Sequence, residues 1–205
     1  MDGPTIQAAA DISLSKGTSA KDVMETLAYA ATLAPAVIMS YWNPIEKYGV
    51  DKFASDMAAA GGSGTITPDL TVEEAGPWLE ACKSHSLNPI FVIAPSSNDQ
   101  RLEHVVKNCG GFVYAASIMG VTGARASVSS AAETLVGRAR KFTNLPISVG
   151  LGVSTPEQAE GVAKYANGVI VGSAFINAVA NAADFESGLE AVRQLAAELK
   201  AGISK

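Results

Sequence analysis

Short apolar runs alternate along the chain with segments whose apolar residues recur every three or four positions. The runs are continuously apolar, which is typical of strands buried on both faces of a parallel sheet. They predict strands at residues 36–42, 64–67, 90–94, 112–116, 147–151 and 168–172. Strands and helices that alternate in this way indicate an α/β fold built from successive strand–helix units.

The segments between the strands predict amphipathic helices, and several of their starts show a capping box. In this motif Ser or Thr stands three residues before Glu or Gln, and each side chain bonds a free backbone N–H of the first turn. The pairs are Thr71 with Glu74, Ser97 with Gln100, Ser130 with Glu133 and Thr155 with Gln158. Pro156 falls in the first turn of the last of these helices, where a missing N–H costs nothing.

The start of the chain offers no strand, because a turn-like stretch at 2–5 leads into helices predicted at 6–16 and 18–32. Six strands suit an open doubly wound sheet, whereas a (β/α)8 barrel needs eight strands and about 250 residues. We expect a TIM barrel that lacks its first two strands, with six parallel strands and surrounding helices. The chain shows no linker and no low-complexity tract, so residues 1–205 are expected to form one partial barrel domain.

Composition excludes several classes of protein. With 48% hydrophobic and 17% charged residues the chain is not disordered. A net charge of −5 argues against nucleic acid and anionic membranes as partners, and no apolar run approaches the length of a membrane span. Cys82 and Cys109 lack metal-ligand spacing and are expected to be free thiols in a reducing cytoplasm. His85 and His104 are expected on the solvated surface.

Two glycine turns follow the last two predicted strands. Gly150 and Gly152 end the first of them, and Gly172 with Ser173 ends the second and opens a short helix. Glycine lets a backbone approach an anion closely, and the first N–H groups of a helix carry partial positive charge. Barrels hold a substrate phosphate between the loops after strands seven and eight. A single glycine at a strand end could be needed only for the geometry of the turn. Two such turns after successive strands predict a phosphate site.

The segment 117–130 has no apolar periodicity, and a structureless segment of this length in a compact domain is often a lid. Gly120 and Gly123 could provide hinge freedom, and Thr122 offers a hydroxyl. A passive surface loop is the alternative.

Two acidic and two aromatic residues complete the candidates. Asp2, before a Gly-Pro turn, could be a general base, although Asp before Gly is also a common turn residue. Asp69, after the second predicted strand, is equally ambiguous. Tyr41 and Tyr114 lie at strand ends and could line an aromatic pocket, while core packing is an equal alternative for Tyr114.

Taken together, these motifs resemble the tryptophan synthase alpha chain family, and their sequences are most similar to those of actinobacterial members. The likeness runs in order from Asp2 to the C-terminal helix. It is carried by the stretches DGPTIQ at 2–7, YWNP at 41–44, PDL at 68–70, GVTGAR at 120–125, GLGVS at 150–154 and GVIVGSA at 168–174.

The resemblance implies a lyase of tryptophan biosynthesis that cleaves indole-3-glycerol phosphate to indole and glyceraldehyde 3-phosphate, without metal or organic cofactor. Two carboxylates share the acid–base work in the family. Asp2 matches one, and the other, a glutamate on the second barrel strand, has no match, so low activity is expected. The resemblance also matches Thr122 to the lid threonine, and it matches the substrate-binding residues to Tyr41, Tyr114, Gly123, Gly152, Gly172 and Ser173.

The resemblance further implies a cytoplasmic α2β2 heterotetramer with a beta subunit that uses pyridoxal phosphate. Asn43, Pro44 and the Asp2 loop are expected where that partner docks. Two other functions compete with this one. The chain could be a non-catalytic fragment that only binds a phosphate ligand or the beta subunit, or another phosphate-binding barrel enzyme such as a ribulose-phosphate epimerase.

Overall fold

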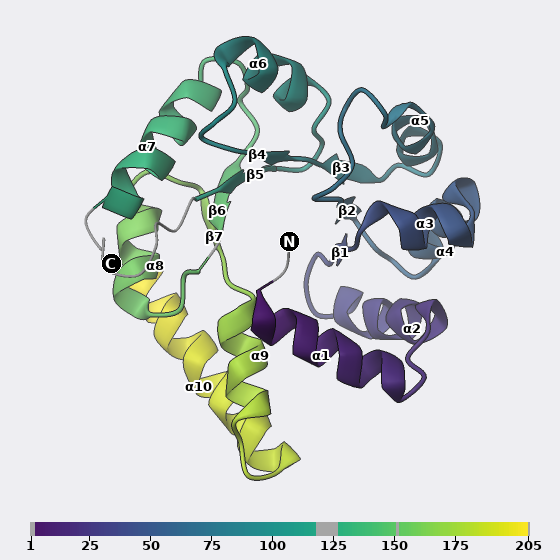
Figure 1. Ribbon diagram of the computed structural model, residues 1–205, viewed down its shortest axis with the longest axis vertical. Helices are drawn as coiled ribbons and strands as arrows, with labels where there is room; N and C mark the ends of the chain where they lie inside the picture. Colours follow the sequence, from purple (N-terminus) through teal and green to yellow (C-terminus); the bar gives the residue numbers. More distant parts are fainter. Residues whose placement is uncertain (1–2, 118–126, 151, 205) are drawn as a thin grey trace. The chain divides into compact units, whose positions relative to one another are not determined.

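The computed structural model describes residues 3–117, 127–150 and 152–204 (Figure 1). The chain divides into two compact units. Unit 1 comprises Met1–Thr18, Ala115–Val136 and Ile147–Lys205, and unit 2 comprises Ser19–Tyr114 and Gly137–Pro146. Each unit is described by itself. The single domain over residues 1–205 stays a prediction.

Unit 2 contains a parallel sheet in the order β1-β2-β3. Its strands are β1 (Ile38–Met39), β2 (Gly64–Ile66) and β3 (Asn88–Ile90), with Ile38 opposite Thr65 and Ile66 opposite Ile90. All of β2 is buried, as expected of a central strand with cover on both faces. The third predicted run, 90–94, contains β4 (Val92–Ile93) but only the last residue of β3, which begins two positions earlier than predicted. The backbone N–H of Tyr114 on β5 (Val113–Ala116) donates to the carbonyl of Phe91, which lies between β3 and β4.

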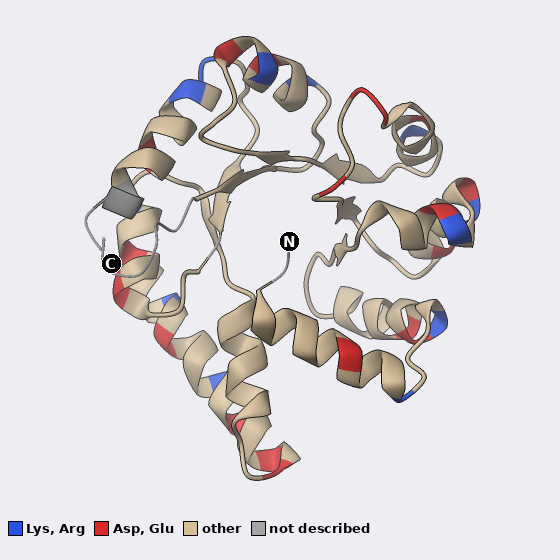
Figure 2. Ribbon diagram, viewed as in Figure 1, with Lys and Arg blue, Asp and Glu red and all other residues tan. Residues whose placement is uncertain are grey.

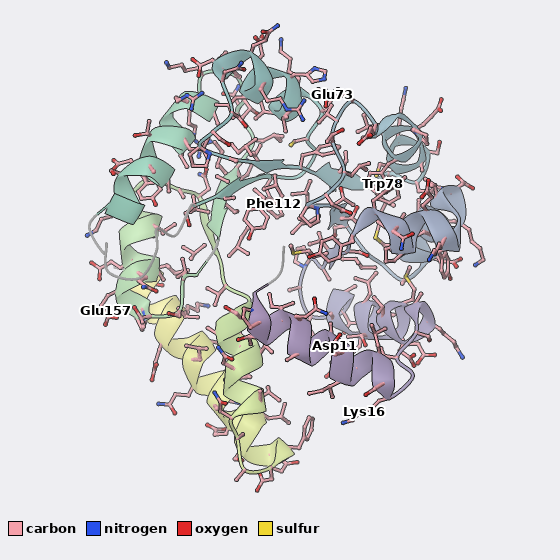
Figure 3. All side chains as sticks on the ribbon, in the orientation of Figure 1. Asp11, Lys16, Glu73, Trp78, Phe112 and Glu157 are labelled. Carbon is pink, nitrogen blue, oxygen red and sulfur yellow. The ribbon has the colours of Figure 1, made fainter. Side chains whose placement is uncertain are left out.

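Six helices lie wholly or partly in unit 2. In chain order their bounds are α2 (Ala20–Ala31), α3 (Trp42–Tyr48), α4 (Val50–Ala59), α5 (Gly76–Ser84), α6 (Asp99–Lys107) and the end of α7 (Ser127–Ala139). Helix α4 buries an apolar stripe of Phe53, Ala54 and Met57. Trp78 on α5, labelled in Figure 3, is completely buried between the rings of Trp42 and Phe53, each 6.2 Å from it. This aromatic cluster forms much of the core of unit 2.

Unit 1 contains the parallel pair β6 (Ile147–Gly150) and β7 (Gly168–Ile170), in which Gly150 lies opposite Ile170. Four of its helices are α1 (Pro4–Ser15), α8 (Pro156–Ala163), α9 (Ser173–Ala180) and α10 (Phe185–Ile203). Helix α10 packs on α8 and α9, and α1 packs on α9. A small apolar cluster of Val153, Ala159 and Leu199 joins the turn after β6 to α8 and α10.

Helix starts agree with the capping boxes in one case of four. Thr155 caps α8, because its hydroxyl accepts from the backbone N–H of Gln158. The other three predictions are wrong: α5 starts at Gly76 after a turn at Thr71–Glu74, Asn98 instead of Ser97 caps α6, and Ser130 lies inside α7. The motif also occurs in turns, because its two side-chain bonds require only one turn of helix-like backbone.

Charge is confined to the helices and connections, since no described strand contains Lys, Arg, Asp or Glu (Figure 2). Several ion pairs are spaced by one helical turn, including Lys52 with Asp56 and Lys107 with Glu103. Within the described residues, no helix combines the length and the apolarity needed to cross a bilayer.

Candidate functional site

The two glycine turns leave the same edge of the β6–β7 pair. Since the strands are parallel and Gly150 lies opposite Ile170, their carboxyl ends lie side by side. The loops that contain Gly152 and Gly172 therefore begin next to each other, as a shared anion site between them requires. Gly152 has a φ of +76°, a left-handed conformation that favours glycine.

Helix α9 begins directly at the second turn. Gly172 is its N-cap and Ser173 its first residue, and no side chain caps this end. A Cβ atom added at Gly172 would meet no atom within 4 Å, so the space before the helix is open. The first backbone N–H groups of a helix have no partner within it, and the helix dipole places partial positive charge there. An anion can fill this space and accept those hydrogen bonds.

The charge of the two loops suits a phosphate. The stretches 147–155 and 168–175 contain no Asp or Glu that would repel a dianion, and no Lys or Arg that would pair with it. Binding by these loops must therefore depend on backbone amides, the helix dipole and the hydroxyl of Ser173.

Gly150 is the last residue of β6 and anchors the start of the first of these loops. It is buried, and its carbonyl accepts hydrogen bonds of 2.9 Å from both the backbone N–H and the hydroxyl of Ser117. Ser117 is itself buried and is the last described residue before segment 118–126. Sequence reasoning treated Ser117 only as the start of a loop. A small hydroxyl residue directly after a buried strand was the one available signal for this contact.

The predicted lid is only partly described. Helix α7 begins at Ser127, so the last residues of the predicted loop, 127–130, are helical and the prediction is wrong there. Thr122 and Gly123 lie outside the described residues, as does Asp2, and their roles stay predictions.

The two predicted pocket tyrosines lie in different environments of unit 2. Tyr41 is 41% exposed and is the N-cap residue of α3, two positions after the end of β1. Tyr114 on β5 is buried, and burial raises the pKa of its phenol. Its burial agrees with core packing, and the pocket role of both tyrosines stays a prediction.

Asp69 has a defined partner. Both of its carboxylate oxygens accept from the backbone N–H of Trp42, at 3.0 and 3.1 Å. The geometry favours the capping interpretation over the general-base interpretation for this residue.

The histidines and cysteines show no catalytic arrangement in the part of the chain that is described. The prediction of a solvated surface position is wrong for His85, which is half-buried with its Nε2 atom 3.0 Å from Oδ1 of Asp51. His104 is exposed, as predicted. Burial raises the pKa of Cys82 to about 12 and that of Cys109 to about 11, and both are free thiols. No three described His, Cys, Asp or Glu residues are grouped so that they could hold a metal ion.

Comparison with known proteins identifies the family. The family model described as "Tryptophan synthase alpha chain" matches residues 1–204. The chain belongs to the tryptophan synthase alpha chain family. The tryptophan synthase alpha chain of Acidothermus cellulolyticus is 54% identical over 206 residues, which are 100% of this chain and 76% of the relative. That of Thermobifida fusca is 55% identical over 207 residues, covering 99% and 77%.

Solved structures agree with this family and its barrel fold. Tryptophan synthase from M. tuberculosis, in its ligand-free form, superposes with a TM-score of 0.90 at 45% identity, over 100% of this chain and 76% of that one. A chain of the Pyrococcus furiosus tryptophan synthase complex superposes with a TM-score of 0.88 at 30% identity, over 98% and 81%. The predicted family, the α/β TIM-barrel class and the lyase class are confirmed. The match does not favour the non-catalytic alternative or another barrel enzyme.

Proposed function

We propose that this tryptophan synthase alpha chain binds indole-3-glycerol phosphate and cleaves it to indole and glyceraldehyde 3-phosphate. The observation that carries the proposal is the pair of glycine turns at one edge of β6 and β7, with the open N-terminus of α9 behind Gly172. These turns supply amide donors for a phosphate without any charged side chain.

The cleavage is a balanced proton exchange. The bond between indole C3 and the neighbouring side-chain carbon breaks, C3 gains a proton, and the hydroxyl on that carbon loses one as the aldehyde forms. One group in one protonation state cannot serve both transfers, so the chemistry requires two acid–base groups. Those two transfers take place at C3 and at the hydroxyl. Asp2 is proposed to accept from the indole N–H and to stabilise the positive charge that develops on the ring as C3 gains its proton, and Thr122 is proposed to close over the site towards it.

No step of this reaction needs a redox carrier or an electron sink, and we propose that it proceeds without metal or organic cofactor. We further propose that the chain works in the cytoplasm with a beta subunit that carries pyridoxal phosphate, to which it delivers indole. The Pyrococcus furiosus neighbour is described as part of a tryptophan synthase α2β2 complex, which supports this partner.

The phosphate site can be tested with two Gly→Asp variants of unit 1. Gly172→Asp places bulk and negative charge in the open space before α9, and we expect the affinity for sn-glycerol 3-phosphate to fall at least about 100-fold. Gly161→Asp on α8 is the matched control, because a Cβ there also meets nothing within 4 Å. Titration calorimetry measures both. Equal affinity of the two variants would contradict the site.

Turnover is measured separately, as indole released from indole-3-glycerol phosphate with and without the beta subunit. We expect Asp2→Asn to lower this release, because Asp2 is the carboxylate proposed to act at the indole N–H. A general acid–base group contributes roughly 10²- to 10⁴-fold to a rate. Release that is unchanged in Asp2→Asn would contradict the proposed role of Asp2.

A further inference from the structure

The start of helix α3 lacks a cap from its own sequence. Its N-cap residue is Tyr41, whose side chain makes no capping hydrogen bond, and no acidic residue lies in its first turn. The first N–H groups of a helix have no partner within it, and an uncapped end frays easily. Helix α3 has only 7 residues, so the loss of one turn would disturb much of it.

Asp69 provides the missing acceptor from another part of the chain. The backbone N–H of Trp42, the first residue of α3, donates to both carboxylate oxygens of Asp69, 27 positions further along. A carboxylate is a strong acceptor, and its charge is favourable beside the N-terminus of a helix. The contact does for α3 what an N-cap side chain normally does.

The loop that carries Asp69 is well anchored. The backbone N–H of Leu70 bonds to the carbonyl of Thr67, which closes a turn directly after β2. Leu70 and Val72, on either side of Thr71, are buried in the core. Asp69 is therefore held in place by its neighbours, so its carboxylate can fix the position of the first residue of α3.

The residues positioned in this way are those that matter for the proposed function. Tyr41, a predicted substrate-pocket residue, immediately precedes the capped N–H, and its carbonyl accepts from the hydroxyl of Ser40 at 3.0 Å. Trp42 also packs its ring on the buried Trp78, so a shift of the helix start would disturb the core. Asn43 and Pro44, expected at the partner interface, follow in the first turn of α3.

We infer that Asp69 is a positioning residue: it caps α3 from the loop after β2 and thereby holds Tyr41 in place for the aromatic part of the substrate. The inference rests on the proposed function for the identity of that substrate. The cap itself stands on hydrogen bonds within unit 2.

The cap can be tested by amide hydrogen exchange at Trp42 and Asn43. Asp69→Ala removes the acceptor, and loss of a helix cap should speed exchange there roughly 3- to 30-fold. Asp69→Asn keeps one acceptor oxygen, and Asn is a good cap, so exchange should stay within about 2-fold of wild type. Glu74→Ala is the matched control, because it removes a carboxylate of the same loop that accepts from the Thr71 hydroxyl. Exchange in Asp69→Ala equal to that in Glu74→Ala would overturn the cap.

Ligand binding tests the positioning. In Asp69→Ala the affinity for indole-3-glycerol phosphate should fall roughly 3- to 10-fold, because only part of the population keeps Tyr41 in place. The affinity for sn-glycerol 3-phosphate should not change, since its proposed loops lie in unit 1. General destabilisation of the protein would lower the affinity for both ligands equally, and this result would overturn the positioning role. Unchanged affinity for both ligands would overturn it as well.

The outcomes also separate this inference from the proposed function. A wild-type chain that binds neither ligand would contradict the proposed function and the positioning of Tyr41 for substrate, while exchange at Trp42 would still decide the cap. A wild-type chain that binds both ligands, with Asp69→Ala unchanged, would contradict the inference alone.

Discussion

Unit 2 packs its helices through large side chains that are completely buried, whereas unit 1 leaves many apolar side chains of its helices in solvent. Trp78, Met57 and Ile45 in unit 2 have no exposed surface. In unit 1, neither α1 nor α9 buries any residue, and Phe185 on α10 is 69% exposed. Helix α2 is an exception within unit 2, since Tyr29 is 71% exposed.

The residues that stabilise the fold most and the loops predicted to bind phosphate therefore lie in different units. Burial of apolar surface is the main favourable term in folding, so the cluster around Trp78 should dominate the stability of unit 2. The predicted phosphate loops lie instead in unit 1, and the second of them leads into α9, a helix that buries no residue. Regions with few buried apolar contacts open most easily, and ligands shift such equilibria by binding the closed form.

The largest expected effect is the loss of the aromatic core. Trp78→Ala should lower the free energy of unfolding by about 3–5 kcal/mol, because it leaves a cavity beside Trp42 and Phe53. The matched change in unit 1, Phe185→Ala, should alter it by less than about 0.5 kcal/mol, since that ring is largely exposed. Denaturant unfolding followed by circular dichroism measures both. Equal costs would mean that the two units are packed equally well.

A second prediction concerns the two thiols of unit 2 and alkaline pH. Burial raises the pKa of Cys82 to about 12 and that of Cys109 to about 11, from an ordinary value of 9.0. The folded state therefore holds these protons more strongly than the unfolded state does. The resulting stabilisation is complete below about pH 9 and is lost as the pH rises towards 11 and 12, by at most about 1.4 kcal/mol per pH unit for each thiol.

The chain has two tryptophans, Trp42 and Trp78, and both lie in unit 2, so their fluorescence follows that unit alone. Stability measured by fluorescence should fall more steeply above pH 9 in the wild type than in a Cys82→Ala/Cys109→Ala variant. Parallel pH profiles of the two proteins would show that the thiols titrate normally and are not protected by burial.

The smallest expected effect compares two sequences that both match the capping-box motif. Thr155→Ala removes the hydroxyl that caps α8 in unit 1 and should cost about 1 kcal/mol. Thr71→Ala removes a hydroxyl that bonds the Glu74 side chain in a turn of unit 2, where no helix starts, and should cost less than about 0.5 kcal/mol. Thermal unfolding of both variants provides the measurement. A larger cost for Thr71 would restore the sequence-based capping prediction there.

Much of the fold could be predicted because it depends on local patterns. Six of the seven described strands lie within the predicted apolar runs, since a strand covered on both faces must be apolar throughout, whereas β3 meets its predicted run only at Ile90. The alternation of these runs with helical segments was equally predictable. Helix starts were not, because Ser, Thr and Asn bond nearby backbone in turns as readily as in helices, and the neighbouring packing decides between the two.

For the site, the sequence determined the two glycine turns after the last strands and the motifs that identify the family. Only the tertiary structure decided that these turns leave one edge together, which depends on the register of Gly150 against Ile170. It also decided the role of Asp69, whose partner lies 27 residues away. Turn residues and motifs are local properties of a chain, whereas register and long-range hydrogen bonds exist only once distant segments have packed.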